Sequence, residues 1–263
     1  DLSDLANEED FEILRKLLLK YNLMSGERLS IVIGNHDIFG GLKTAEDIFT
    51  FPDYCCSVNY ENKVMLFNSY FKEAFDHTIY KSESNYYPFA KLLDTTLLVG
   101  VNSIAHYSKL KNPFAANGKV SKEQLSELTN IMNDFGSLVE KRVLLIHHHF
   151  NKIKSKFNLG AKSLWAVVEN QTMKLKNKKK LLNLISKFNF DLVLHGHFHE
   201  NKNYKRKEIN FLNSGGTIKN GKADSLLYNL IDIESNQIST NTEELFFMTS
   251  VNQKKRSQSK LLV

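Results

Sequence analysis

The sequence is poor in cysteine: only two occur among 263 residues, and they are adjacent, at Cys55 and Cys56. Adjacent cysteines seldom bridge each other without strain, so we expect no disulfide framework, and the composition fits a reducing compartment. Long apolar runs are missing as well. No stretch of about 18 or more apolar residues occurs, which excludes a membrane-spanning helix. Because there is also no linker rich in Pro, Gly or Ser and no internal repeat, one domain is expected.

The charge balance is basic, with 35 Lys and Arg against 29 Asp and Glu, a net charge of +6. Such a balance favours anionic partners without identifying one. The Lys-rich segment 174–180 and the tail residues 254–256 hold much of the excess, and we interpret both as solvated surface, so no nucleic-acid partner is expected. The basic, Leu-containing tail and the segment 148–177 are compatible with contact at a membrane surface. The expected location is cytoplasmic, with a peripheral membrane position left open.

Hydrophobic periodicity alternates between strand and helix through most of the chain, which favours a layered α/β domain. The spacing predicts helices over 8–24, 122–134 and 178–188. It predicts strands over 29–33, 96–101, 142–146, 190–194, 208–212 and 226–233. The aromatic-rich segment 38–96 is interpreted as short strands with one short helix near 69–77. Residues 1–250 form the expected domain, and residues 251–263 form a flexible basic tail.

Three polar clusters directly follow predicted strands. They are Gly34-Asn35-His36-Asp37, His147-His148-His149 and Gly196-His197-Phe198-His199. Because ligands bind beyond the carboxyl ends of strands in α/β proteins, the clusters indicate one site along a sheet edge. Histidine, carboxylate and amide ligands without thiolates suit Zn, Mn or Fe. Gly196 permits a sharp bend, after which His197 and His199 could serve two neighbouring metals.

The clusters together resemble the signature of the calcineurin-like metallophosphoesterases. That superfamily shows, in order, Asp-x-His, Gly-Asp, Gly-Asn-His-Asp/Glu, a His after a strand, and Gly-His-x-His. The last three occur here, and Asp1-Leu2-Ser3-Asp4 resembles the residues that come after the Gly of the second motif. Tyr87-Pro88-Phe89 and the segments 98–103 and 191–197 also resemble the cyclic-nucleotide-phosphodiesterase-like branch. The resemblance covers nearly the whole chain and implies an α/β fold, a sandwich of two mixed β-sheets flanked by helices.

The resemblance also implies a role for each matching residue. Asp1 would bridge two divalent metal ions (Mn, Fe or Zn), with Asn35, His147 and His197 completing one shell and His199 binding the other metal. His36, oriented by Asp37, would stabilise the transition state or protonate the leaving oxygen, while a metal-bound hydroxide attacks phosphorus. The ligand is placed at His147 because it is nearest the strand end, but His148 stays open as an alternative. His195 is interpreted as a supporting residue.

The implied substrate is an anionic phosphoester, in the first place a phosphodiester such as a cyclic nucleotide. The alternative is hydrolysis of the pyrophosphate of UDP-diacylglucosamine in lipid A synthesis. The chain departs from the family pattern in one respect, because the Asp-x-His motif is absent and one metal shell is therefore incomplete. We expect that the chain is truncated before this motif. A catalytically deficient, metal-binding relative is the competing hypothesis.

Overall fold

The computed structural model of the chain describes residues 1–41, 47–150, 173–198, 201–215 and 225–246. Its helices are α1 (Glu8–Lys20), α2 (His36–Phe39), α3 (Asp47–Ser57), α4 (Tyr60–Tyr70), α5 (Lys122–Phe135) and α7 (Lys178–Lys187), with 3-10 helices η1 (Lys72–Phe75) and η2 (Gly136–Leu138). Its strands are β1 (Tyr80–Lys81), β2 (Phe89–Leu93), β3 (Thr96–Val101), β4 (Gly118–Lys119), β5 (Lys141–Ile146), β6 (Leu175–Lys176), β7 (Leu192–His195), β8 (Lys202–Arg206), β9 (Ile209–Asn213), β10 (Ser225–Ile233) and β11 (Ile238–Phe246).

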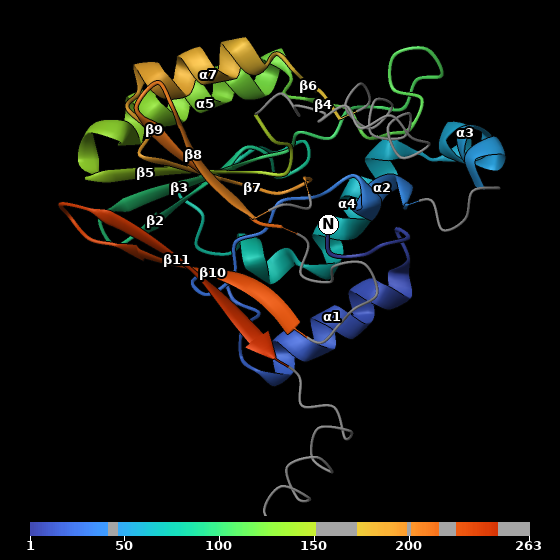
Figure 1. Cartoon of the computed structure of the whole chain (residues 1–263), viewed down its shortest axis with the longest axis horizontal. Helices are drawn as coiled ribbons and strands as arrows, with labels where there is room; N and C mark the ends of the chain where they lie inside the picture. Colours follow the sequence, from blue (N-terminus) through green and yellow to red (C-terminus); the bar gives the residue numbers. More distant parts are fainter. Residues whose placement is uncertain (42–46, 151–172, 199–200, 216–224, 247–263) are drawn as a thin grey trace, which may run out of the picture.

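The central element is a seven-stranded mixed sheet with the order β1-β2-β3-β5-β7-β9-β8 (Figure 1). Strands β3, β5, β7 and β9 run parallel, and antiparallel partners flank them on both sides. Neighbouring parallel strands end at the same edge, since Ile146 at the end of β5 pairs with His195 at the end of β7. The chain segments that leave β5 and β7 therefore emerge side by side, and this edge carries the candidate site.

Each face of the sheet contributes to its own hydrophobic core, because successive side chains of a strand point to opposite faces. On one face, Leu97 and Leu144 belong to a cluster with apolar residues of α5 and α7, and Figure 1 shows these two helices covering the sheet. On the other face, Leu98 and Val143 belong to a cluster with residues of α1 and α4, against which Ile231 of β10 packs. The predicted α/β class, with a large mixed sheet and flanking helices, is confirmed.

The layer opposite the large sheet is less regular than a second mixed sheet. Among the described residues it contains the antiparallel hairpin β10–β11 beside helices α1 and α4. A further two-stranded parallel pair, β4–β6, lies outside both. None of the helices in the described ranges combines the length and apolarity that a bilayer crossing requires. Of the segment 148–177, the structure describes only residues 148–150 and 173–177. The expected tail at 251–263 lies outside the described residues.

Most sequence-predicted elements are present. Helices α1, α5 and α7 and strands β3, β5, β7, β9 and β10 overlap the predicted ranges. The interpretation of 38–96 as short strands with one short helix near 69–77 was right in part, since η1, β1 and β2 are present. It was wrong for the described residues before Tyr80, most of which are helical, in α2, α3, α4 and η1. Aromatic side chains favour strands statistically, but here Val64, Phe67 and Phe71 recur at helical spacing and are fully buried against Phe11 of α1. Tertiary packing therefore overrides the local preference.

The predicted strand at 29–33 was also wrong. Ile31 and Ile33 are buried, as the pattern indicated, but no described strand pairs with this segment. A strand exists only through hydrogen bonds to a neighbouring strand. A run of apolar residues indicates that a segment is buried. It does not indicate whether another strand pairs with that segment.

A buried lysine, Lys91, binds the backbone at Gly26 and Leu29, just before Ile31 and Ile33. The Nζ of Lys91, on β2, donates to the carbonyls of Gly26 at 2.6 Å and Leu29 at 2.7 Å, and the side chain is 1% exposed. Burial disfavours the ammonium and lowers the pKa of Lys91 to about 8. The two carbonyls leave the amine hydrogen-bonded in either protonation state.

This lysine predicts a pH dependence of stability. Between pH 8 and the ordinary lysine pKa, the unfolded chain binds more protons at this position than the folded chain does, so the free energy of unfolding rises with pH. The lowered pKa of Lys91 changes the free energy of unfolding by at most about 3 kcal/mol over this pH range, at 1.36 kcal/mol per pKa unit. Urea unfolding of wild type and Lys91→Met from pH 7.5 to 10 measures it. The wild type should gain stability relative to the variant as pH rises, and parallel pH profiles would contradict the assignment.

Candidate metal centre

The end of β5 and the end of β7 bring two of the predicted clusters together. His147 follows Ile146 directly, and Gly196 follows His195 directly. The backbone N–H of Gly196 donates to the carbonyl of His147 at 3.0 Å, which extends the pairing of the two strands by one step. His197 then adopts a positive φ of 68°. The sharp bend expected at Gly196 therefore occurs at His197 itself, a conformation that is uncommon for a residue with a side chain.

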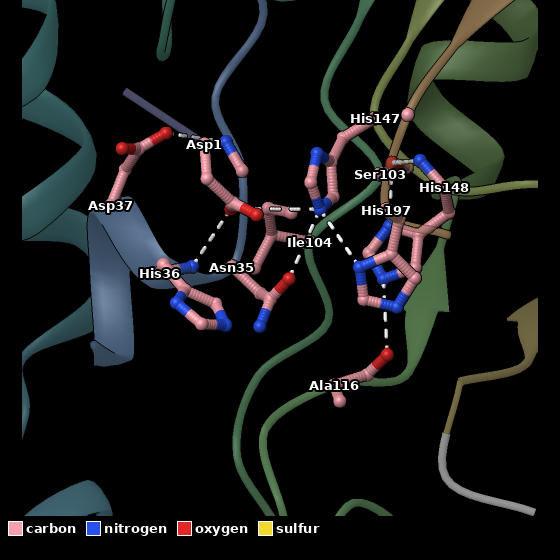
Figure 2. Close-up of polar contacts among 12 residues, drawn as sticks. Asp1, Asn35, His36, Asp37, Ser103, Ile104, Ala116, His147, His148 and His197 are labelled. Atoms are coloured by element: carbon pink, nitrogen blue, oxygen red, sulfur yellow. Dashed lines mark hydrogen bonds and ion pairs between the residues drawn. The ribbon is translucent and has the colours of Figure 1, made fainter. Parts of the chain in front are cut away.

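The bend turns His197 back towards His147. The Nδ1 of His197 lies 2.9 Å from the Nε2 of His147. The same Nε2 lies 3.0 Å from the Oδ1 of Asn35 and 3.6 Å from the Oδ1 of Asp1. Figure 2 shows Asp1 and Asn35 on one side of the His147 ring and His197 on the other. Three of the five predicted metal ligands thus approach the Nε2 of a fourth, His147, whereas His199 lies outside the described residues.

The two imidazoles of this cluster are buried. His147 is 4% exposed and His197 is 7% exposed. Burial lowers the pKa of both imidazoles well below the ordinary histidine value, and the neighbouring histidines lower it further. Both rings are therefore neutral near pH 7, which is the protonation state in which histidine binds a metal ion.

The donor set fits a metal ion better than it fits a network of hydrogen bonds. A neutral histidine has one N–H, so the Nε2 of His147 can donate to only one of the three acceptors around it. The Nε2 of His197 has no hydrogen-bond partner in the described part of the chain although it is buried. A cation would satisfy the converging oxygen and nitrogen atoms together. The contacts are pairwise, however, and no three His, Cys, Asp or Glu side chains of the described residues surround a common point as a finished site.

The loop before α2 carries Asn35 into the cluster. The backbone N–H of His36 donates to the Oδ1 of Asp1 at 3.0 Å, so the carboxylate lies at the amino end of α2. Gly34 makes this approach feasible, because a Cβ at position 34 would lie 2.0 Å from the same Oδ1. A residue with a side chain at position 34 would therefore displace Asp1.

The carboxylate of Asp37 accepts hydrogen bonds from the backbone of this region. Its Oδ1 accepts the N–H groups of Leu2 at 2.7 Å and Ser3 at 2.8 Å, and its Oδ2 accepts the N–H of Gly34 at 2.8 Å. The side chain is fully buried. These bonds fasten the chain start, with Asp1, to the loop that carries Asn35.

The predicted orientation of His36 by Asp37 is not what the structure shows. The Nδ1 of His36 lies 3.0 Å from the Oδ1 of Asp4. Asp37 follows His36 directly on a helix, and neighbouring helical residues do not face each other. Asp4 is the partner of His36 that the sequence reasoning missed. The spacing from Asp1 to Asp4, with two carboxylates in one short motif, was the available signal.

Two further histidines have structural partners. The Nδ1 of His148 lies 2.8 Å from the Oγ of Ser103, and its Nε2 lies 3.2 Å from the carbonyl of Ala116. The Nε2 of His195 lies 2.8 Å from the hydroxyl of Tyr204. With both ring nitrogens engaged, His148 supports the cluster from behind, and the geometry favours His147 as the ligand between the two.

Comparison with known proteins agrees with this arrangement. A sequence model of the calcineurin-like phosphoesterases matches residues 1–201, more than half of the chain and the part that contains Asp1, Asn35, His147 and His197. The chain belongs to the calcineurin-like phosphoesterase family. This is a family of hydrolases whose members depend on a pair of metal ions, so the predicted family and enzyme class are confirmed, while the metal's identity is not.

Solved structures give weaker likenesses. A 5'-nucleotidase assigned in Staphylococcus aureus is 15% identical with a TM-score of 0.41; the match covers 92% of this chain and 44% of that protein. A dimetal phosphatase from Danio rerio is 12% identical with a TM-score of 0.45, and the match covers 91% of this chain and 90% of that one. The chain thus spans less than half of the nucleotidase's length. No curated protein sequence matches it.

In this structure the predicted site residues fall into three groups. Asp1, Asn35 and His197 each contact the Nε2 of His147. His36 lies beside them through its backbone bond to Asp1, and Asp37 lies away from them on the other side of Asp1 (Figure 2). His199 stays a prediction.

Proposed function

We propose that this phosphoesterase hydrolyses a phosphodiester at the cluster formed by Asp1, Asn35, His147 and His197. The observation that carries the proposal is the convergence of an oxygen or nitrogen atom of the other three residues on the Nε2 of His147, within 2.9–3.6 Å. The four come from four separate parts of the chain, so their meeting is a property of the fold. His147 and His197 follow the carboxyl ends of the parallel strands β5 and β7, where ligands bind in α/β proteins.

The proposed ligands are two oxygen donors and two imidazole nitrogens, which suit Mn, Fe or Zn. A bound metal ion would supply Lewis-acid polarisation of the phosphoryl oxygens and activation of a water molecule. His199 is proposed as a ligand of the second metal, with Asp1 shared between the two. The protein's own contribution is to hold neutral imidazoles and an immobilised carboxylate at a buried point, so that little reorganisation is needed when the metal and the substrate bind.

We assign proton transfer to His36. The ring is 31% exposed, and its backbone N–H binds the carboxylate that faces the cluster. Pairing of Nδ1 with Asp4 leaves Nε2 available on the exposed side, where it can donate a proton to the leaving oxygen. Asp4 acts as a positioning residue, because it selects the ring orientation and the tautomer.

The proposed substrate class rests on the sequence. Tyr87-Pro88-Phe89 and the 98–103 segment resemble the cyclic-nucleotide-phosphodiesterase-like branch, and the basic net charge of +6 favours an anionic substrate. Cyclic nucleotides are therefore the first candidates. The pyrophosphate of UDP-diacylglucosamine is the second, and product analysis distinguishes them.

The test is metal removal. The protein is stripped with a chelator and assayed with bis-p-nitrophenyl phosphate, cyclic AMP and the UDP-linked lipid, before and after addition of Mn²⁺, Fe²⁺ or Zn²⁺. We expect hydrolysis to disappear on chelation and to return with one or more of the ions. Full activity after complete metal removal, or no hydrolysis of any phosphoester by the metal-loaded protein, would overturn the proposal. The second outcome would favour a metal-binding relative without catalysis.

A further inference from the structure

Two of the most exposed apolar side chains in the described part of the chain lie in neighbouring elements. Leu110 is 93% exposed and Phe49 is 83% exposed. Isolated apolar residues on a surface are ordinary and need no explanation. Two that project from adjacent segments, beside a set of lysines, need one.

An ion pair places the two segments against each other. The Nζ of Lys109 lies 3.6 Å from the Oδ1 of Asp53 on α3. Asp53 follows Phe49 by four residues, so both lie on one face of the helix. Leu110 follows Lys109 directly, and Figure 1 shows α3 at the outer end of the molecule, near the loop that leaves β3. Phe49 and Leu110 therefore project from the same region of the surface.

The turn that carries Leu110 is held by hydrogen bonds. The backbone N–H of Asn112 donates to the carbonyl of Ser108 at 2.8 Å, and the Nδ2 of Asn112 donates to the carbonyl of His106 at 3.2 Å. The Nδ2 of Asn117 donates to the carbonyl of Lys111 at 3.1 Å. With its backbone fixed in this way, the turn presents Leu110 outward, and no described residue covers the side chain.

Lysines surround this turn. Lys109 and Lys111 flank Leu110, and the Nζ of Lys176 donates to the carbonyl of Lys111 at 3.3 Å. Lys176 of β6 is also the register partner of Lys119 of β4. Two acids lie near these lysines: Asp53 pairs with Lys109, and Glu123 interacts with Lys119. Lys109, Lys111 and Lys176 thus gather positive charge around Leu110, as expected where an anionic partner binds.

We propose that Phe49, Lys109, Leu110, Lys111 and Lys176 form a docking surface for an anionic lipid bilayer. Phe49 and Leu110 would enter the boundary between headgroups and acyl chains, and the lysines would contact lipid phosphates. Charge complementarity together with projecting apolar side chains favours this occupant. Nucleic acid would use the lysines and could stack a base on Phe49, but an exposed leucine adds nothing to either contact.

The docking surface is connected to the metal centre. The loop that carries Leu110 continues to Ala116, whose carbonyl lies 3.2 Å from the Nε2 of His148, the residue after His147. The same loop therefore joins the docking surface to a residue next to a proposed metal ligand. The inference concerns binding alone, and its test does not depend on hydrolysis.

The experiment is co-sedimentation with vesicles of phosphatidylcholine alone or with 30% phosphatidylserine added (roughly the anionic content at which basic surfaces bind). We expect wild type to bind only the anionic vesicles. The double variant Phe49→Ser/Leu110→Ser should bind at least about fivefold more weakly, and Lys111→Glu/Lys176→Glu at least about tenfold more weakly, from roughly 1 kcal/mol per basic residue near the surface. Leu138→Ser and Lys16→Glu are matched controls, since these side chains are 74% and 71% exposed elsewhere on the molecule.

Three results would overturn the proposal. The first is no binding of wild type to anionic vesicles at low salt. The second is equal loss of binding in the control variants. The third is unchanged binding of the Phe49→Ser/Leu110→Ser protein, which would indicate attraction by charge alone. Because all the substituted side chains are exposed, thermal melting should show the variants folded as wild type.

Discussion

Replacement of Asn35 or His197 by alanine is expected to abolish metal-dependent phosphoester hydrolysis, with kcat/KM reduced about 10³-fold or more. Each supplies one of the atoms that converge on the Nε2 of His147, at 3.0 Å and 2.9 Å. A metal ion contributes several kcal/mol of transition-state stabilisation, and each 1.36 kcal/mol corresponds to a factor of ten in rate. Loss of a ligand lowers both the occupancy of the site and the alignment of the ion.

The measurement pairs steady-state kinetics with metal analysis of the purified variants. His106→Ala is the matched control for His197→Ala, because His106 stacks on Tyr60 with 4.1 Å between ring centroids and its side chain is 69% exposed. This control should keep wild-type activity and metal content. Wild-type kinetics in Asn35→Ala or His197→Ala would show that the cluster around His147 is not the active site.

Asp37→Asn is expected to destabilise the protein by about 3 kcal/mol, whereas Asp4→Asn should leave stability nearly unchanged. The carboxylate of Asp37 accepts three backbone N–H groups and is fully buried. An amide nitrogen in place of Oδ2 would face the N–H of Gly34, leaving two donors opposed in the interior, and an unsatisfied buried group costs roughly 1–3 kcal/mol in addition to the lost bond. The melting temperature should fall by roughly 10 °C for a chain of this size.

Asp4 provides the contrast, since its side chain is 79% exposed and touches the ring of His36. Asp4→Asn should lower kcat about tenfold at an unchanged melting temperature and should alter the pH profile of kcat, because an amide cannot stabilise a charged imidazole. Thermal unfolding and pH–rate profiles of the two variants measured side by side separate the roles. A stable Asp37→Asn protein with reduced kcat, beside an Asp4→Asn protein with wild-type kinetics, would restore Asp37 as the partner of His36.

These two carboxylates show that a sequence motif does not by itself indicate where its side chains point. Asn35, His36 and Asp37 are consecutive, and the sequence indicated that they share one site. Their side chains nevertheless diverge, because the short helix α2 rotates each residue away from the next. Asn35 enters the metal cluster, while Asp37 turns to the backbone of the chain start. The partner of His36 came from another segment, at Asp4, which no local pattern around His36 could identify.

The sequence by itself determined the order of most strands and helices after Thr96, the family, and the residues that gather around the Nε2 of His147. These follow from periodicity and from strand-end clusters, which are local properties of the chain. Tertiary structure alone decided that 29–33 pairs with no described strand, that the aromatic segment before Tyr80 is mainly helical, and that Phe49 and Leu110 project from one surface. The physical reason is that pairing, packing and exposure depend on the neighbours of a segment, whereas hydrophobic spacing reports only that one side of it is buried.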